Sequence, residues 1–241
     1  MSEVILKLNV FMSLEKISQK MLQKFLLYVK NKMFDYIFLD LDGPIHEGKF
    51  RHYACYKDII KKYGGNALEI DYYWELKRNK ITRDIILEKS NFQESYEIFF
   101  KEWMISIENE KYLNLDILKP EVVETLKSWR NITDKIVLVT MRQNREYLLN
   151  QLDRLGILCL LNEVIDCPPQ RKNTKYEALK DKIFNNAIFI GDTEEDTNTA
   201  KMLGIKSIGI TNGLRNKKFL EADYYYEEIK DIDFNRLEIN E

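Results

Sequence analysis

Cysteine is scarce in this chain of 241 residues, and its three positions follow no recognisable pattern. Cys55, Cys159 and Cys167 match neither the spacing of a zinc site nor that of a redox pair. Disulfides also need an oxidising compartment, and an odd number of scattered thiols is typical of proteins from a reducing one. The cysteines therefore predict no disulfide framework and no zinc site, and they favour a cytoplasmic protein.

Long apolar runs, an excess of one charge and glycine-rich nucleotide loops are also missing. No apolar run approaches the roughly 18 residues of a membrane span, and the formal net charge is only −2 at pH 7. Acidic and basic residues are intermixed, unlike the basic surface of a nucleic-acid-binding protein. Walker-type and dinucleotide-binding loops are absent, so ATP or NAD chemistry has no support. We expect a small-molecule ligand, no membrane span and no nucleic acid, and the oligomeric state stays unknown.

Residues 1–33 are basic and show the three- and four-residue repeat of apolar side chains that is typical of an amphipathic helix. We expect this extension to dock on its own domain, which is the commoner arrangement. A helix that binds a membrane surface or a partner is an alternative. A third alternative is that translation begins at Met33, so that residues 1–32 are not part of the natural product.

Residues 36–43 form an apolar run that ends in two acids, Asp40 and Asp42, and a glycine, Gly43. A continuously apolar strand is typical of a parallel sheet covered on both faces, where ligands bind beyond the carboxyl ends of the strands. Side chains at i and i+2 point to the same side of a strand, so two such carboxylates repel each other unless a cation lies between them. Mg²⁺ fits this demand. The alternative is an ordinary strand end followed by an Asp-Gly turn.

The next seventy residues have a different pattern, with helical periodicity and many aromatic side chains. Helices are expected at about 52–63, 66–79, 81–89 and 91–109. We therefore expect a helical insertion at residues 51–119, whose aromatic residues form a core of their own.

Strands and helices alternate after Pro120. Strands are expected at 135–140, 162–166, 187–192 and 206–210, with helices at 120–130, 143–155, 174–182 and 194–203. This order predicts an α/β fold, a doubly wound, Rossmann-like parallel sheet built from residues 34–50 and 120–241.

Three of the expected strands end in polar groups: Asp40 and Asp42, then Thr140, then Asp192 followed by Asp196. Parallel strands bring these ends to one edge of the sheet. Clustered carboxylates destabilise a fold unless a cation offsets their charge. This set therefore indicates a functional site that binds Mg²⁺.

The same residues resemble the short motifs of the haloacid dehalogenase superfamily. Its first motif, Asp-x-Asp-Gly, is similar to residues 40–43, and its second, a Thr or Ser that ends an apolar strand, is similar to Thr140. Lys175 corresponds to the lysine of the third, and residues 191–196 carry the fourth, Gly-Asp-x-x-x-Asp. The insertion after the first motif resembles the helical cap of the phosphoglycolate-phosphatase-like branch.

The resemblance implies a phosphatase that acts on a small phosphate ester through an aspartyl-phosphate. It makes Asp40 the nucleophile and Asp42 the general acid and base. Thr140 and Lys175 would hold the phosphoryl oxygens. Mg²⁺ would be bound by Asp40, Asp192 and the backbone carbonyl of Asp42, with Asp196 orienting the metal shell or the lysine.

Some positions depart from the family pattern. Pro44 replaces a common Thr, and Arg142 lies close behind Thr140 where Asn is common, which makes Arg142 a candidate substrate contact. His46 is a second candidate because it lies near the acids, although a histidine in a loop is more often merely solvated. Lys172 is an alternative to Lys175, since no proline follows Lys175.

Two other functions stay open. A phosphomutase of the same family would use the same residues. A non-catalytic phosphate-binding or regulatory protein belongs to a different class. Metal-dependent turnover of an aryl phosphate would separate an enzyme from a binding protein.

Overall fold

The structure, a computed structural model, describes residues 32–169 and 172–237 of the chain. Its centre is a six-stranded parallel sheet with the strand order β5-β4-β1-β6-β7-β8. The strands are β1 Phe34–Leu39, β4 Thr133–Met141, β5 Glu163–Cys167, β6 Ala187–Gly191, β7 Lys206–Ile210 and β8 Tyr224–Tyr226. The strand that carries the first pair of acids, β1, therefore lies in the interior of the sheet.

Strand β1 is apolar throughout because both of its faces are covered. Ile37 and Leu39 point into one hydrophobic cluster, whereas Phe38 points into another on the opposite face. Strand β4 alternates in the same way, with Leu138 in the first cluster and Val139 in the second. The continuous apolar runs of the sequence thus build two cores, one on each side of the sheet.

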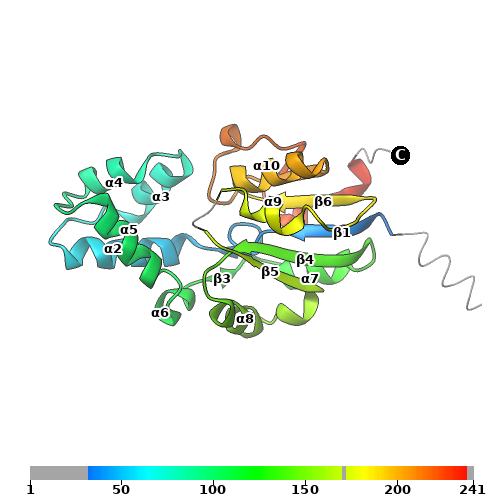
Figure 1. The fold of residues 1–241 in the computed structure, drawn as a ribbon, viewed down its shortest axis with the longest axis horizontal. Helices are drawn as coiled ribbons and strands as arrows, with labels where there is room; N and C mark the ends of the chain where they lie inside the picture. Colours follow the sequence, from blue (N-terminus) through cyan, green and yellow to red (C-terminus); the bar gives the residue numbers. More distant parts are fainter. Residues whose placement is uncertain (1–31, 170–171, 238–241) are drawn as a thin grey trace, which may run out of the picture.

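Two pairs of helices cover these faces (Figure 1). Helices α7 Val122–Trp129 and α8 Arg145–Arg154 contribute to the first cluster, and α9 Thr174–Leu179 and α10 Glu194–Leu203 to the second. Parallel neighbouring strands with helices on both faces make a doubly wound α/β core. The predicted fold class is confirmed.

A separate group of helices, here called the helical region (residues 49–113), lies beside one end of the sheet (Figure 1). Its aromatic and aliphatic side chains form a third hydrophobic cluster. Tyr56 and Tyr73 stack at its centre with ring centroids 4.2 Å apart. The helices are α2 Lys49–Lys62, α3 Ile70–Arg78, α4 Arg83–Lys89, α5 Tyr96–Ser106 and α6 Glu110–Leu113.

The chain enters and leaves the helical region through a small antiparallel sheet. Strand β2, His46–Glu47, pairs with β3, Ile117–Leu118, so the two connections lie side by side. Neither strand is apparent from the sequence, because a two-residue strand has no periodicity.

Several element boundaries differ from the sequence-based expectations. Helix α3 begins at Ile70 instead of 66, and the helix expected at 91–109 is divided into α5 and α6. Strand β8 at the sheet edge was not expected at all. The helix expected within residues 1–33 lies outside the described residues. Among the residues that the structure describes, no helix has the length and apolar composition needed to cross a membrane.

The double coverage of β1 gives a stability prediction. Phe38 is fully buried and lies 6.1 Å, ring centroid to centroid, from Phe189. Phe38→Ala should lower the free energy of unfolding by about 3–5 kcal/mol, because it removes a buried ring and leaves a cavity. Denaturant unfolding measures this change. Ile183→Ala is the control, since Ile183 is 91% exposed; equal losses in the two variants would contradict the two-core description.

Candidate active site

Three neighbouring strands bring the predicted site residues together. Asp40 directly follows β1, Thr140 lies at the end of β4, and Asp192 directly follows β6. Strand β1 pairs with β4 on one side and with β6 on the other, so all three side chains lie at the same edge of the sheet. The backbone amide of Asp40 donates to the carbonyl of Ile190 at 2.9 Å, which extends this pairing into the site.

Three carboxylates converge at this edge. Asp40, Asp192 and Asp196 are all buried, and one oxygen of each lies within 4.8 Å of the others. Burial, with the nearby charges of Asp196 and Asp42, raises the pKa of Asp40 to about 7 in spite of the opposing charge of Lys175. Burial and the charges of Asp40 and Asp196 likewise raise the pKa of Asp192. A cation bound here would remove this repulsion.

The carboxylate of Asp192 is held by glycine-lined loops. A Cβ atom at Gly43 would lie 2.0 Å from Asp192 Oδ2, and one at Gly213 would lie 2.2 Å from the same oxygen. Gly43 also has a φ of +94°, which favours glycine. The Leu214 amide donates to Oδ2 at 2.5 Å, whereas Oδ1 is buried with no hydrogen-bond partner in the described part of the chain. A hard cation fits this pattern, because it would supply a partner for Oδ1.

Lys175 lies in the middle of the acids. Its Nζ atom is 2.8 Å from Asp40 Oδ1 and 2.6 Å from Asp196 Oδ1. The lysine is buried in the first turn of α9, and the charges of the two aspartates raise its pKa, overcoming the effect of burial. Lys172 is exposed. The structure thus brings Lys175, rather than Lys172, to the predicted nucleophile.

The carboxylate of Asp196 is held in place by hydrogen bonds at the start of α10. Its Oδ2 accepts hydrogen bonds from the amides of Asp192 and Thr193 and from the Thr193 hydroxyl, which forms a capping box at the start of α10. Its Oδ1 is left to contact Lys175. Asp196 therefore fixes the positions of both Asp192 and the lysine.

Thr140 lies in the interior of the same edge with an unused hydroxyl. The residue is 1% exposed, and its Oγ1 has no hydrogen-bond partner among the described residues. A buried hydroxyl without a partner costs free energy, so it is usually explained by a water, an ion or a ligand. An oxygen of a bound phosphoryl group would supply this partner.

Asp42 has a different environment from Asp40, although only one residue separates them. Its Oδ2 is 2.5 Å from Arg142 Nη1, its Oδ1 is bound by Arg51, and His46 Nε2 lies 3.6 Å away. Burial alone would raise the pKa of Asp42, but the charges of Arg142 and Arg51 outweigh burial and hold it well below its ordinary value. Asp42 is therefore an ionised carboxylate in this structure.

The residues that surround Asp42 include two that the sequence did not reveal. Arg51 lies in α2 of the helical region. Its Nε is 2.8 Å from the buried carboxylate of Asp116, the residue that precedes β3. Gln151 of α8 donates to the same carboxylate at 2.6 Å. No local motif marks Arg51 or Asp116, because they are 65 residues apart and meet only where the two connecting segments pair.

Both sequence-predicted candidates for substrate contact lie in this cluster. His46 is completely buried, so the expectation that it is merely solvated is wrong; burial lowers its pKa. Asp42, His46 and Asp116 have the spacing of a metal site, but Arg51 and Arg142 already neutralise the two carboxylates. Arg142 Nη1 donates a hydrogen bond to Asp42, whereas the buried Nε and Nη2 of Arg142 have no hydrogen-bond partner in the described residues. It could donate these to an anion.

The helical region contacts the core on both sides of this site. Arg78 at the end of α3 donates to the carbonyls of Thr211 and Gly213 at 2.7 and 2.5 Å, next to the loop that holds Asp192. On the other side, the buried carboxylate of Glu108 accepts hydrogen bonds from the amides of Gln143 and Asn144, both at 2.9 Å, just after Arg142. These contacts place the helical region over the strand ends (Figure 1).

Comparisons with known proteins agree with this arrangement. The model of the haloacid dehalogenase-like hydrolase family matches residues 34–204. No curated protein sequence matches the chain significantly.

Solved structures with a similar fold include three proteins of 20% sequence identity or less. A predicted phosphatase from Clostridium acetobutylicum has a TM-score of 0.64 and 16% identity over 83% of this chain and 96% of its own. A predicted phosphoglycolate phosphatase from Haemophilus somnus has a TM-score of 0.55 and 18% identity over 83% and 96%. A Thermotoga maritima protein assigned as a beta-phosphoglucomutase has a TM-score of 0.58 and 20% identity over 81% and 95%. These likenesses show the fold.

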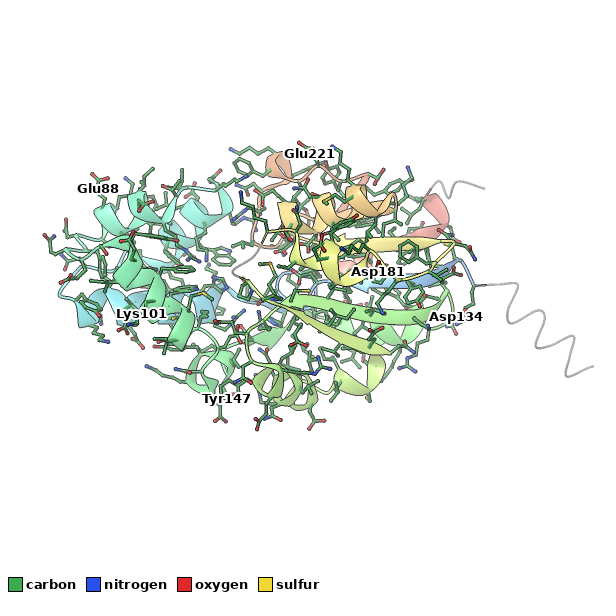
Figure 2. All side chains as sticks on the ribbon, viewed as in Figure 1. Glu88, Lys101, Asp134, Tyr147, Asp181 and Glu221 are labelled. Carbon is green, nitrogen blue, oxygen red and sulfur yellow. The ribbon has the colours of Figure 1, made fainter. Side chains whose placement is uncertain are left out.

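The carboxylate cluster predicts pH-dependent metal binding. Mg²⁺ should raise the melting temperature, and its affinity should be about tenfold weaker at pH 6 than at pH 8, because the pKa of about 7 leaves Asp40 mostly protonated at pH 6. Asp192→Asn should abolish the shift. Asp181→Asn, on the surface (Figure 2), should leave it unchanged. A shift of equal size in both variants would contradict this metal site.

Proposed function

The chain belongs to the haloacid dehalogenase-like hydrolase family, and on this premise we propose that it is a Mg²⁺-dependent phosphatase of a small phosphate ester. The observation that carries the proposal is the environment of Asp40. This carboxylate lies between a buried lysine and two further buried acids, next to a threonine hydroxyl that has no partner within the described chain. Such a site suits a nucleophile that attacks an anionic centre with the help of a cation.

The metal would be held by the carboxylates of Asp40 and Asp192, together with the backbone carbonyl of Asp42. Two observations support these metal ligands: the two buried carboxylates converge, and Oδ1 of Asp192 has no hydrogen-bond partner among the described residues. Once bound, Mg²⁺ would neutralise charge on the phosphoryl oxygens and lower the repulsion between the substrate and the acids.

In the first half of the reaction, a carboxylate oxygen of Asp40 attacks the phosphorus, and the bond from phosphorus to the ester oxygen breaks. Lys175 and Thr140 hold the phosphoryl oxygens, and the charge of Lys175, whose Nζ lies 2.8 Å from Asp40 Oδ1, opposes the rise in the pKa of Asp40. The leaving oxygen receives a proton from Asp42. The products are an aspartyl-phosphate and a free alcohol.

The first step requires Asp42 to be protonated, although two arginines hold it as a carboxylate in this structure. Arg142 resolves this conflict. Its Nε and Nη2 have no partner in the described residues, so they can donate to an incoming phosphoryl group while Nη1 stays on Asp42. The negative charge of the phosphoryl group beside Asp42 then raises the pKa of Asp42 and lets it carry a proton to the leaving oxygen.

In the second half, Asp42 removes a proton from a water molecule, which attacks phosphorus and breaks its bond to Asp40. Inorganic phosphate leaves, and both aspartates return to their starting states. The ionised state of Asp42 that the two arginines favour suits this step.

We further propose that residues 51–119 are a cap that shields the aspartyl-phosphate from stray water. The contacts of Arg78 with the loop after β7, and of Glu108 with the loop after β4, support this role. They join the helical region to the core on both sides of the site.

The lysine assignment can be tested directly. Lys175→Ala should lower kcat/KM for an aryl phosphate by roughly 100-fold or more, because the transferring phosphoryl group loses the positive charge that contacts Asp40. Lys172→Ala should have little effect, since Lys172 is exposed. The opposite ranking, measured by steady-state kinetics with Mg²⁺, would move the phosphate-binding lysine by three residues.

Substitution of the two aspartates of the first motif should affect turnover in different ways. Asp40→Asn should abolish turnover, because it removes the nucleophile. Asp42→Asn retains the backbone carbonyl and should still bind Mg²⁺, but it cannot protonate the leaving oxygen. Its loss of kcat should therefore be larger for an alkyl phosphate than for p-nitrophenyl phosphate, whose leaving group needs little protonation. Equal losses on the two substrates would exclude the acid role of Asp42.

A further inference from the structure

The helical region contains a cavity of about 170 Å³ that the proposed chemistry does not use. Its walls come from α2, α3, α4 and α5, and the loop after β7 closes one side with Leu214 and Arg215. Tyr73, Phe99 and Trp103 give it a largely aromatic lining. An apolar cavity of about 150 Å³ is known to hold a benzene molecule, so this one accepts a group of similar size.

The cavity is also lined by cations and by no acidic residue. Lys77 Nζ lies 2.5 Å from His52 Nδ1 and within 6 Å of the ring centroids of Tyr73, Trp74 and Trp103. Arg83 lies over Trp103, with its guanidinium carbon 5.1 Å from the ring centroid. Neither cation forms an ion pair with a carboxylate of the described residues.

This concentration of positive charge is unfavourable without a compensating anion. Burial, followed by the charges of Arg83 and Arg215, lowers the pKa of Lys77 well below its ordinary value, and Arg51 adds to the effect, with only Asp42 opposing it. Burial and the charge of Lys77 also lower the pKa of His52. An anionic group in the cavity would remove this repulsion and gain charge-assisted hydrogen bonds.

The cavity adjoins the reaction centre. A smaller cavity at the strand ends is lined by Asp42, Asp192 and Gly213, and His52 and Leu214 line both spaces. Because the two spaces share these lining residues, a substrate bound at the strand ends would reach the larger cavity beside His52. The part of the substrate that reaches the cavity is the part farthest from the reacting phosphorus.

We propose that this cavity binds the leaving group of the substrate, and that this group carries a carboxylate or a second phosphate at its far end, on a body no larger than one six-membered ring. The proposal rests on the proposed phosphatase function and names its substrate class. Lys77 and Arg83 bind the anion, whereas Arg215 is already paired with Glu194, and the aromatic walls contact the body. A nucleoside is too large for this space.

Three aryl phosphates with similar leaving-group basicity test the proposal in the presence of Mg²⁺. 4-(Carboxymethyl)phenyl phosphate carries an anion at its far end, 4-ethylphenyl phosphate is neutral there, and 4-(aminomethyl)phenyl phosphate is cationic. We expect kcat/KM to be at least tenfold higher for the carboxylated ester than for the neutral one, mainly through KM, and lowest for the cationic ester.

Variants of the cavity separate anion binding from a general effect on the fold. Arg83→Gln should reduce the ratio of kcat/KM between the carboxylated and neutral esters about tenfold, and Lys77→Gln should act in the same direction. Lys101→Gln is the matched control, because Lys101 is an exposed cation of α5 (Figure 2), and it should leave the ratio unchanged. A ratio that Arg83→Gln and Lys77→Gln leave unchanged would overturn the proposal.

The same assays distinguish a cavity that does not bind an anion from a protein that is not a phosphatase. Equal kcat/KM for the three esters would refute the anionic leaving group and leave the phosphatase intact. If none is hydrolysed, calorimetric binding of 4-hydroxyphenylacetate still tests the cavity. Binding that Arg83→Gln weakens at least tenfold, and Lys101→Gln does not, supports the anion site; absence of binding, or equal binding in the two variants, overturns it.

Discussion

The arrangement of the site depends on an excess of negative charge at the end of β1. Asp40, Asp192 and Asp196 are buried together, and Lys175 is the cation that contacts two of them. One lysine cannot balance three carboxylates in a low-dielectric environment, so their burial is costly without another cation. The fold maintains this arrangement through backbone contacts, including the capping box of α10 and the close approach of Gly43 and Gly213 to Asp192. The charge imbalance is the physical basis for proposing Mg²⁺ and an anionic substrate.

The cavity of the helical region has the opposite imbalance. Arg51 reaches Asp42 from α2, and Lys77 and Arg83 line a cavity without an acidic residue. The cationic cavity thus adjoins the negatively charged strand ends, with His52 and Leu214 lining both spaces. A phosphate ester with a second anionic group would match both sides once a metal is bound, because its phosphoryl group meets the metal and Lys175 while its far end meets the cations.

The α/β fold and its site edge were predictable from the sequence because they depend on local patterns. Apolar runs defined β1, β4 and β6, and the acids and threonine at their ends had to meet once those strands were parallel. The surroundings of Asp42 were not predictable in this way. Arg51 and Asp116 carry no motif, and they meet through the pairing of the short strands β2 and β3. The burial of His46 has the same origin, since a two-residue strand and the cluster around it leave no periodic signal.

The proposed phosphatase reaction requires that Asp40 becomes phosphorylated during turnover. Its most direct test is to quench the enzyme with acid while it hydrolyses an aryl phosphate with Mg²⁺, reduce it with borohydride and map the modified residue by peptide mass spectrometry. Reduction of an aspartyl-phosphate converts the aspartate into homoserine, so we expect homoserine at position 40 and an unchanged aspartate at position 42. Homoserine at a position other than 40, in an enzyme that releases phosphate, would contradict the assignment of Asp40 as the nucleophile.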